Sequence, residues 1–87
     1  MNITFEHAAF GGLSSLTSDV QRVILGVIAE LRRDPRLVDA IEFEPNHFLL
    51  PISAYVVLYD IEDEGEIVII TVGPRGLALG QGGSFGV

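Results

Sequence analysis

The most informative stretch of this chain reads AYVVLYDIEDEGEIVIITV (Ala54–Val72). Two runs rich in β-branched and aromatic residues, 54–61 and 67–72, are joined there by a short charged loop. Runs of this composition are typical of strands, and so short a connection between them predicts an antiparallel hairpin. Because the second run is almost continuously apolar, we expect its strand to be buried on both faces.

One amphipathic helix is predicted upstream of this hairpin. Ser18 is a suitable N-cap, and Gln21 follows at the spacing of a capping box. The Asp34-Pro35 pair ends the helix, because a residue before proline avoids helical angles. The apolar face of this helix is widened by two further residues, Leu25 and Ala29. Its main positions follow the i, i+3, i+4, i+7 rule, and they are Val20, Val23, Ile24, Val27, Ile28 and Leu31.

The flanking segments give weaker signals. Met1–Phe5 alternates as a short strand does, and Gly11-Gly12 predicts a break in structure. Leu37–Glu44 fits either a last helical turn or a strand. His47–Leu50 is predicted as a strand. Because proline has no amide hydrogen to donate, Pro51 predicts that this strand either lies on a sheet edge or ends there.

These elements predict an α+β domain over residues 1–76, in which a small antiparallel sheet of about four strands packs against one main helix. Residues 77–87 are glycine-rich and are predicted to be a flexible tail. A single helix cannot cover both faces of such a sheet. We therefore expect apolar surface to remain exposed, which usually marks an interface.

Composition excludes several classes of function. The 87 residues include twelve acids, five arginines and no lysine, and the net charge is −7. Phosphate contacts are made by basic side chains, so binding to nucleic acid or to the ribosome is disfavoured. The absence of cysteine excludes a disulfide framework and thiol catalysis, and two histidines make a metal site unfavourable, so we expect neither metal nor cofactor. No stretch fits a signal peptide or a membrane span, and a cytoplasmic location is expected.

Two segments follow a known pattern. Leu16–Arg36 is similar to a helix written LPxxVQxxIxxxIxxLxxDPR, and Ala54–Arg75 is similar to a hairpin written GdYRVxYxIdde…IxIxxVgHR. In this order they are typical of the RelE/ParE superfamily of small toxins from type II toxin–antitoxin systems, which the chain resembles from about Ile3 to Arg75. The resemblance implies the toxin fold and an antitoxin partner. For ribonuclease members it also implies a cationic cleft that cuts messenger RNA at the ribosome.

The chain departs from the family at the positions where the resemblance implies catalytic residues. Val56 stands in place of an arginine, Pro74 in place of a histidine, and Leu79 near a late tyrosine. The basic strand before the hairpin is Phe48–Pro51 here. Arg75 alone occupies a position that the resemblance marks as catalytic. Cleavage of RNA by its own 2′-hydroxyl needs a base, an acid and positive charge, and one arginine supplies only the last.

Other candidate residues have ordinary structural explanations beside the functional ones. His7 and His47 are the available imidazoles, and each is more typical of a surface or hydrogen-bonded histidine than of a catalytic one. Tyr55 and Tyr59 share a strand face, where core packing is favoured over base stacking. Two groups of charged residues also have ordinary explanations. Adjacent acids are typical of a solvated loop, and this applies to Glu62, Asp63, Glu64 and Glu66. Positive charge is favoured at the C-terminal end of a helix, and this applies to Arg32, Arg33 and Arg36.

Three hypotheses follow. The first is a toxin-family protein with a degenerate nuclease site that binds an antitoxin, or a second copy of itself, through exposed apolar surface. The second is an active ribosome-dependent mRNA endoribonuclease that uses Arg75. An activity against gyrase, as in ParE-type toxins, is a further alternative, but no local sequence pattern indicates it. The third is an oligomeric structural or regulatory domain that uses the same fold. The residues predicted to bind the partner are Val20, Leu25, Ala29, Phe48, Leu50 and Tyr55.

Overall fold

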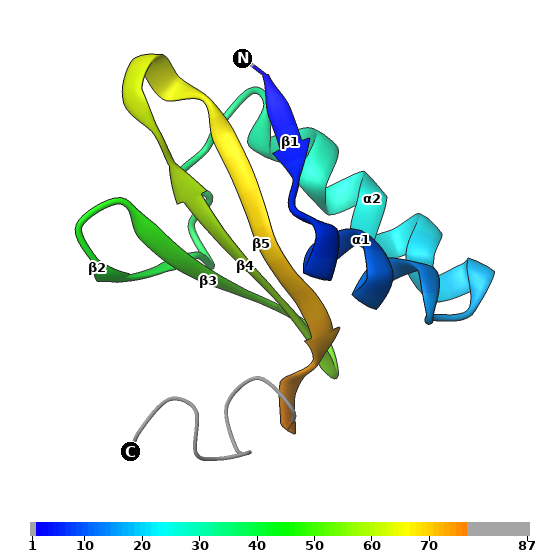
Figure 1. Ribbon diagram of the computed structural model, residues 1–87. Helices are drawn as coiled ribbons and strands as arrows, with labels where there is room; N and C mark the ends of the chain where they lie inside the picture. Colours follow the sequence, from blue (N-terminus) through cyan, green and yellow to red (C-terminus); the bar gives the residue numbers. More distant parts are fainter. Residues whose placement is uncertain (1, 77–87) are drawn as a thin grey trace.

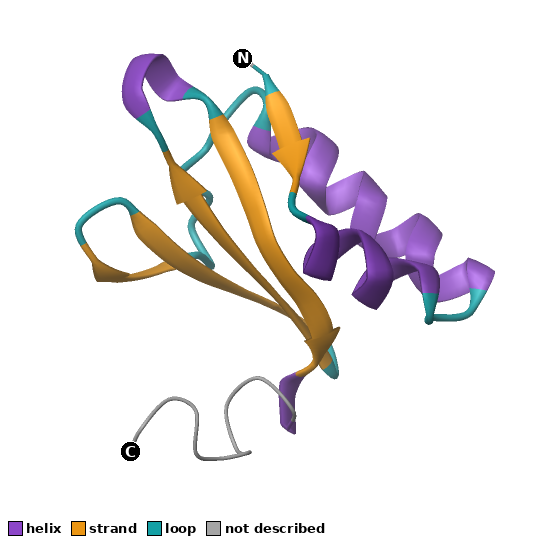
Figure 2. Cartoon of the chain, viewed as in Figure 1, coloured by secondary structure: helices purple, strands orange, loops and turns teal. Residues whose placement is uncertain are grey.

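The computed structural model describes residues 2–76. Within that range the chain forms five strands and two α-helices, in the order β1 (Ile3–Phe5), α1 (His7–Ser14), α2 (Ser18–Leu31), β2 (Ile41–Glu44), β3 (His47–Ile52), β4 (Tyr55–Ile61) and β5 (Ile67–Pro74). Both helices lie on the same side of the sheet (Figure 1, Figure 2). The predicted α+β class is confirmed, and the predicted tail lies outside the described residues.

The sheet is mixed and has the strand order β1–β5–β4–β3–β2. The strands from β2 to β5 are antiparallel neighbours, whereas β1 runs parallel to β5 with Ile3 opposite Ile67. The expected sheet of about four antiparallel strands therefore gains a fifth strand. That strand is β2. It lies in the stretch 37–44, whose sequence fits either a helical turn or a strand, and the alternation of Ile41 and Phe43 with glutamates is the signal that indicates the strand.

Pro51 lies where the outer edge of β3 is unpaired. β2 pairs with β3 only at His47, Phe48 and Leu49, so β3 has no outer partner at Pro51 among residues 2–76. Proline lacks the N–H that a strand donates, and it is tolerated where no neighbouring strand needs that donor. The expectation from the sequence is thus only partly right: β3 is an inner strand that continues to Ile52, and only its part around Pro51 lacks an outer neighbour.

A β-bulge decides which side chains of β5 face the helices. The register shifts between Leu58 and Tyr59, so that Leu58 pairs with Thr71 and Tyr59 pairs with Ile69. The extra residue in β5 changes the alternation of side chains between the two faces. As a result Ile67, Ile69 and Val72 are all buried in one core, which regular alternation would not allow.

The helix α2 supplies the other half of this core. Ile24, Ile28 and Leu31 are buried against the sheet, as the helical spacing predicted. The N-cap is Thr17 rather than Ser18, because the Thr17 hydroxyl accepts the Val20 N–H at 3.4 Å. The helix ends at Leu31, three residues before the Asp34-Pro35 pair. The arginines that follow therefore lie in the connection to β2 rather than in the last helical turn.

The helix α1 was missed by the sequence analysis, which assigned Gly11-Gly12 to a break. Both glycines lie inside α1, whose buried residues are Ala9 and Leu13. A Cβ built on Gly12 would stand 2.1 Å from the Val72 carbonyl oxygen, whereas one on Gly11 would meet nothing within 4 Å. Gly12 is therefore a packing residue that lets the helix approach the backbone of β5.

We expect Gly12→Ala to destabilise the fold by about 3 kcal/mol or more, because the helix must move away from backbone atoms that cannot yield. Gly11→Ala is the matched control, and it should be neutral or stabilising by up to about 1 kcal/mol through helix propensity. Urea denaturation followed by circular dichroism measures both. Equal effects of the two substitutions would contradict the packing role of Gly12.

The connection after α2 is fastened to the sheet by Tyr59. Its hydroxyl donates a hydrogen bond of 2.6 Å to the carbonyl oxygen of Pro35, and its ring stacks on Phe48 with centroids 5.1 Å apart. Burial raises the pKa of Tyr59 to about 12. Tyr59 is fully buried, so of the two explanations offered for this tyrosine, core packing is confirmed.

We expect Tyr59→Phe to lower the free energy of unfolding by about 1–2 kcal/mol, because it leaves the Pro35 carbonyl without its donor. The control is Tyr55→Phe, a half-buried tyrosine of the same strand, for which a change below about 0.5 kcal/mol is expected. Urea denaturation of the three proteins gives the comparison. A loss no larger in Tyr59→Phe than in the control would show that the hydrogen bond contributes little.

Candidate functional site

Arg75, the catalytic candidate, follows β5 and is exposed. Its guanidinium donates to the carbonyl oxygen of Ser53 at 3.2 Å, and its backbone N–H donates to the carbonyl oxygen of Ala54 at 2.9 Å. Both partners belong to the turn between β3 and β4. The side chain is thus bound to backbone oxygen at one end of the sheet.

The arginines that follow α2 lie away from Arg75. Arg36 contacts the carboxylate of Glu42 at 2.9 Å and the side-chain oxygen of Asn46 at 3.4 Å, next to the turn between β2 and β3. That turn and Arg75 are separated by the six residues of β3, or about 17 Å. Arg75 and Arg36 therefore cannot act on one phosphate.

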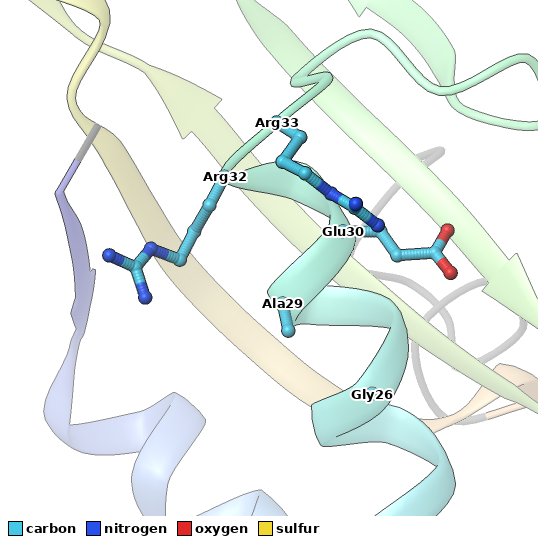
Figure 3. Close-up of a pocket in the computed structure, with 5 residues that line it drawn as sticks. All are labelled: Gly26, Ala29, Glu30, Arg32 and Arg33. Atoms are coloured by element: carbon cyan, nitrogen blue, oxygen red, sulfur yellow. The ribbon is translucent and has the colours of Figure 1, made fainter.

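Arg32 and Arg33 also do not form a cationic cleft. They line an open hollow of about 550 Å³ together with Gly26, Ala29 and Glu30. In Figure 3 the side chain of Arg32 extends toward one side of the helix and that of Arg33 toward the other. The two guanidinium groups thus lie on opposite sides of the helix, so they cannot contact the same ligand in this hollow.

His47 and Asp60 form a cross-strand pair between β3 and β4. The two residues are opposite in the register, and Nδ1 of His47 lies 2.5 Å from Oδ1 of Asp60. This hydrogen bond raises the pKa of His47 above 6.5, with smaller upward contributions from the negative charges of Asp60, Glu44 and Glu62. The ring of Phe43 lies beside it, with centroids 6.3 Å apart. His47 is thus the hydrogen-bonded histidine that the sequence favoured.

We expect the ion pair of His47 and Asp60 to make stability depend on pH. The pKa of His47 is raised on folding, so the stabilisation is complete below the ordinary pKa of 6.5 and is lost as pH rises through the raised value. NMR titration of the imidazole and urea denaturation across this range measure the two effects. In Asp60→Asn the pKa should fall, and the pH dependence of stability in that range should weaken. An unchanged pKa in that variant would contradict the assignment.

The structure separates the six predicted contact residues into two groups. Phe48 and Leu50 are each 2% exposed and belong to the core, so the sequence analysis was wrong to treat them as exposed surface. They alternate along β3 with Leu49, and the register turns them toward the helices. The remaining residues retain exposed surface: Val20 and Tyr55 are half-buried, and Leu25 and Ala29 are exposed.

Val20 and Tyr55 meet in an apolar groove. One hollow of about 270 Å³ lies between the start of α2 and the turn after β3, where its lining includes Val20, Val23 and Tyr55. A second hollow of about 390 Å³ continues from it along the connection between α2 and β2. The two hollows share Ile52 and Ser53. We call this continuous feature the α2–β3 groove.

Sequence reasoning missed Val23 and Val38 as surface residues of this groove. Val23 is 59% exposed and Val38 is 95% exposed. Val23 follows the same spacing as the buried residues of α2, and only the position of the sheet shows that the stripe extends past the core. Leu50, which was predicted to contact the partner, is buried but forms part of the wall of the second hollow.

Two further properties of residues 2–76 bear on the site. No helix in that range is both long and apolar enough to cross a membrane. In the same range, no group of three or more histidine and acidic side chains is arranged to hold a metal ion. The geometry thus offers one apolar groove and scattered arginines.

Comparison with known proteins gives a clear result for the fold. No family model matches the sequence, and no curated protein matches it. The RelBE toxin–antitoxin complex of E. coli contains a chain that is 21% identical, with a TM-score of 0.74 over 84% of this chain and 94% of that one. The RelBE2 toxin–antitoxin complex of Mycobacterium tuberculosis gives 24% identity and a TM-score of 0.72, covering 85% and 96% of the two chains.

An archaeal complex extends this likeness. The RelE–RelB complex of Pyrococcus horikoshii contains a chain that is 20% identical, with a TM-score of 0.71 over 86% of this chain and 94% of that one. The likeness therefore spans nearly the whole length of each compared chain, at low sequence identity. The resemblance found in the helix and hairpin patterns is confirmed in three dimensions: this chain has the fold of the RelE toxins.

Proposed function

We propose that this chain is a cytoplasmic RelE-like toxin-family protein with a degenerate nuclease site, and that it acts by binding a protein partner, an antitoxin in the first place. The observation that carries the proposal is the separation of Arg75 from Arg36 and His47. Its guanidinium is bound to the Ser53 carbonyl, about the length of β3 away from Arg36 and from His47.

The chemistry of RNA cleavage explains why this separation matters. A phosphorane needs positive charge from several donors at once, and the 2′-hydroxyl needs a base within hydrogen-bonding distance. Arg75 cannot serve as that base, because its pKa is too high. His47 is held by Asp60 and lies among acids, which repel a polyphosphate strand.

Partner binding is supported by the compared structures and by the surface. The three solved structures compared above are all complexes of a toxin with its antitoxin. In this chain the groove keeps large aliphatic side chains in contact with solvent. Such surface usually marks an interface.

Induced expression in bacteria tests the loss of catalysis. We expect cells that express the wild-type chain to grow like cells with an empty vector, and Arg75→Ala to change nothing, because one arginine without a nearby base cannot carry the reaction. Growth curves after induction measure this. Growth arrest that Arg75→Ala relieves would instead identify an active mRNA endoribonuclease.

Partner binding is tested on the purified chain by size-exclusion chromatography with light scattering. We expect a complex with the product of an adjacent gene, co-expressed from the same operon. A self-associated chain that binds no such product would favour an oligomeric structural or regulatory role. A monomer that binds neither would argue against the proposal altogether.

A further inference from the structure

The α2–β3 groove combines exposed apolar side chains with an acidic rim. We propose that it docks a basic amphipathic helix of about three turns from the partner protein. This inference rests on the proposed function, in which the chain acts through a protein partner. It adds where the partner binds, in which conformation and with which charge.

The apolar content of the groove supplies the anchor points. Val23 and Val38 are largely exposed, while Val20, Val27 and Tyr55 are half-buried beside them. Single exposed aliphatic residues are common on protein surfaces, whereas several that share one concave feature are typical of an interface. An apolar stripe on a partner would remove all five from water together.

Pro51 selects a helix over an added strand as the occupant. The groove follows the outer edge of β3 beyond the reach of β2, where an added strand would pair with Pro51. Proline has no N–H to donate, so the ladder would lack a bond at the centre of the site. A helix satisfies its own backbone and needs only the apolar surface. Along α2, the lining runs from Asp19 to Glu30, or about 16 Å, the rise of three helical turns.

The charges on the rim indicate that the docked segment of the partner is positively charged. Asp19, Glu30 and Asp39 are exposed and belong to the lining. Among the described residues that line the two hollows, none is basic. Arg22 lies 3.6 Å from Asp19, but both side chains are highly exposed, and such a pair neutralises little. With a net charge of −7, the chain attracts a cationic segment and repels a second copy of itself.

A synthetic peptide provides the direct test on the full-length chain. It has about 14 residues, with leucine at every third or fourth position and lysine on both flanks of that stripe. A second peptide replaces each lysine by glutamate. Fluorescence anisotropy should show saturable binding of the lysine peptide, and affinity for the glutamate peptide at least about tenfold weaker. Equal binding of the two would overturn the proposed charge.

Substitutions on α2 locate the site. Val23→Glu should weaken binding of the lysine peptide at least about tenfold, because a buried carboxylate replaces an apolar contact. Leu25→Glu is the matched control. Leu25 was predicted from the sequence to contact the partner, but it is 43% exposed on the same helix and lines neither hollow. Circular dichroism confirms that both variants are folded. Equal weakening in the two variants, or NMR shift changes confined to β2, would overturn the location.

The acidic rim is tested by a pair of double substitutions that change the net charge equally. Asp19→Asn with Asp39→Asn should weaken binding by about threefold to tenfold at low salt, and less at high salt. Asp63→Asn with Glu64→Gln removes two charges from the turn between β4 and β5 and should have an effect below twofold. Equal effects would show that net charge, and not the groove, attracts the peptide.

The natural partner separates this inference from the proposed function. If the adjacent-gene product binds the wild-type chain and Val23→Glu equally, the inference fails and the proposed function stands. If no such product binds but the lysine peptide occupies the groove, the proposed function fails and the inference stands. If light scattering shows a wild-type dimer that Val23→Glu separates, a second copy fills the groove and the proposed partner is wrong.

Discussion

The β-bulge opposite Leu58 and Tyr59 is the constraint on which the architecture depends. Regular alternation would place Val72 on the face opposite Ile67 and Ile69, and the core would lose its contact with that end of β5. The bulge brings all three to the same face. It also sets the Val72 backbone against Gly12, so that α1 and α2 form one layer on one side of the sheet.

The same architecture separates the charged groups. The turn between β2 and β3 and the loop between β4 and β5 meet at one end of the sheet, where the Ile61 N–H donates to the Asn46 carbonyl. The seven acids of residues 40–74 belong to that end, and Arg36 is bound to one of them, Glu42. Arg75 lies at the other end. The fold of the RelE toxins thus carries Arg36 and Arg75 at opposite ends of the sheet in this chain, and this separation is what the proposed loss of nuclease activity rests on.

Local patterns predicted the elements that have a strong period, and tertiary contacts decided the rest. The spacing of Ile24, Ile28 and Leu31 predicted α2, and the two apolar runs predicted the β4–β5 hairpin. The helix α1 was missed because a glycine that permits close packing has the same sequence signature as one that breaks a helix. β3 is apolar at Phe48, Leu49 and Leu50 alike, so only the register shows which of them face the core, and the groove depends on that same register.

The α2–β3 groove combines apolar side chains, which favour association, with acidic side chains, which oppose association between copies of this chain. Leaving a valine side chain in water costs about 1.5 kcal/mol relative to burial, so the exposed stripe on α2 weakens the isolated chain and favours association. Association with a second copy would place Asp19, Glu30 and Asp39 near acids of the same sign. In the proposed complex a cationic segment gains both the apolar contact and the opposite charge, whereas a second copy would gain the apolar contact against repulsion. The acids on which the proposed loss of RNA binding rests are thus the same groups that would make the apolar surface selective for a cationic partner.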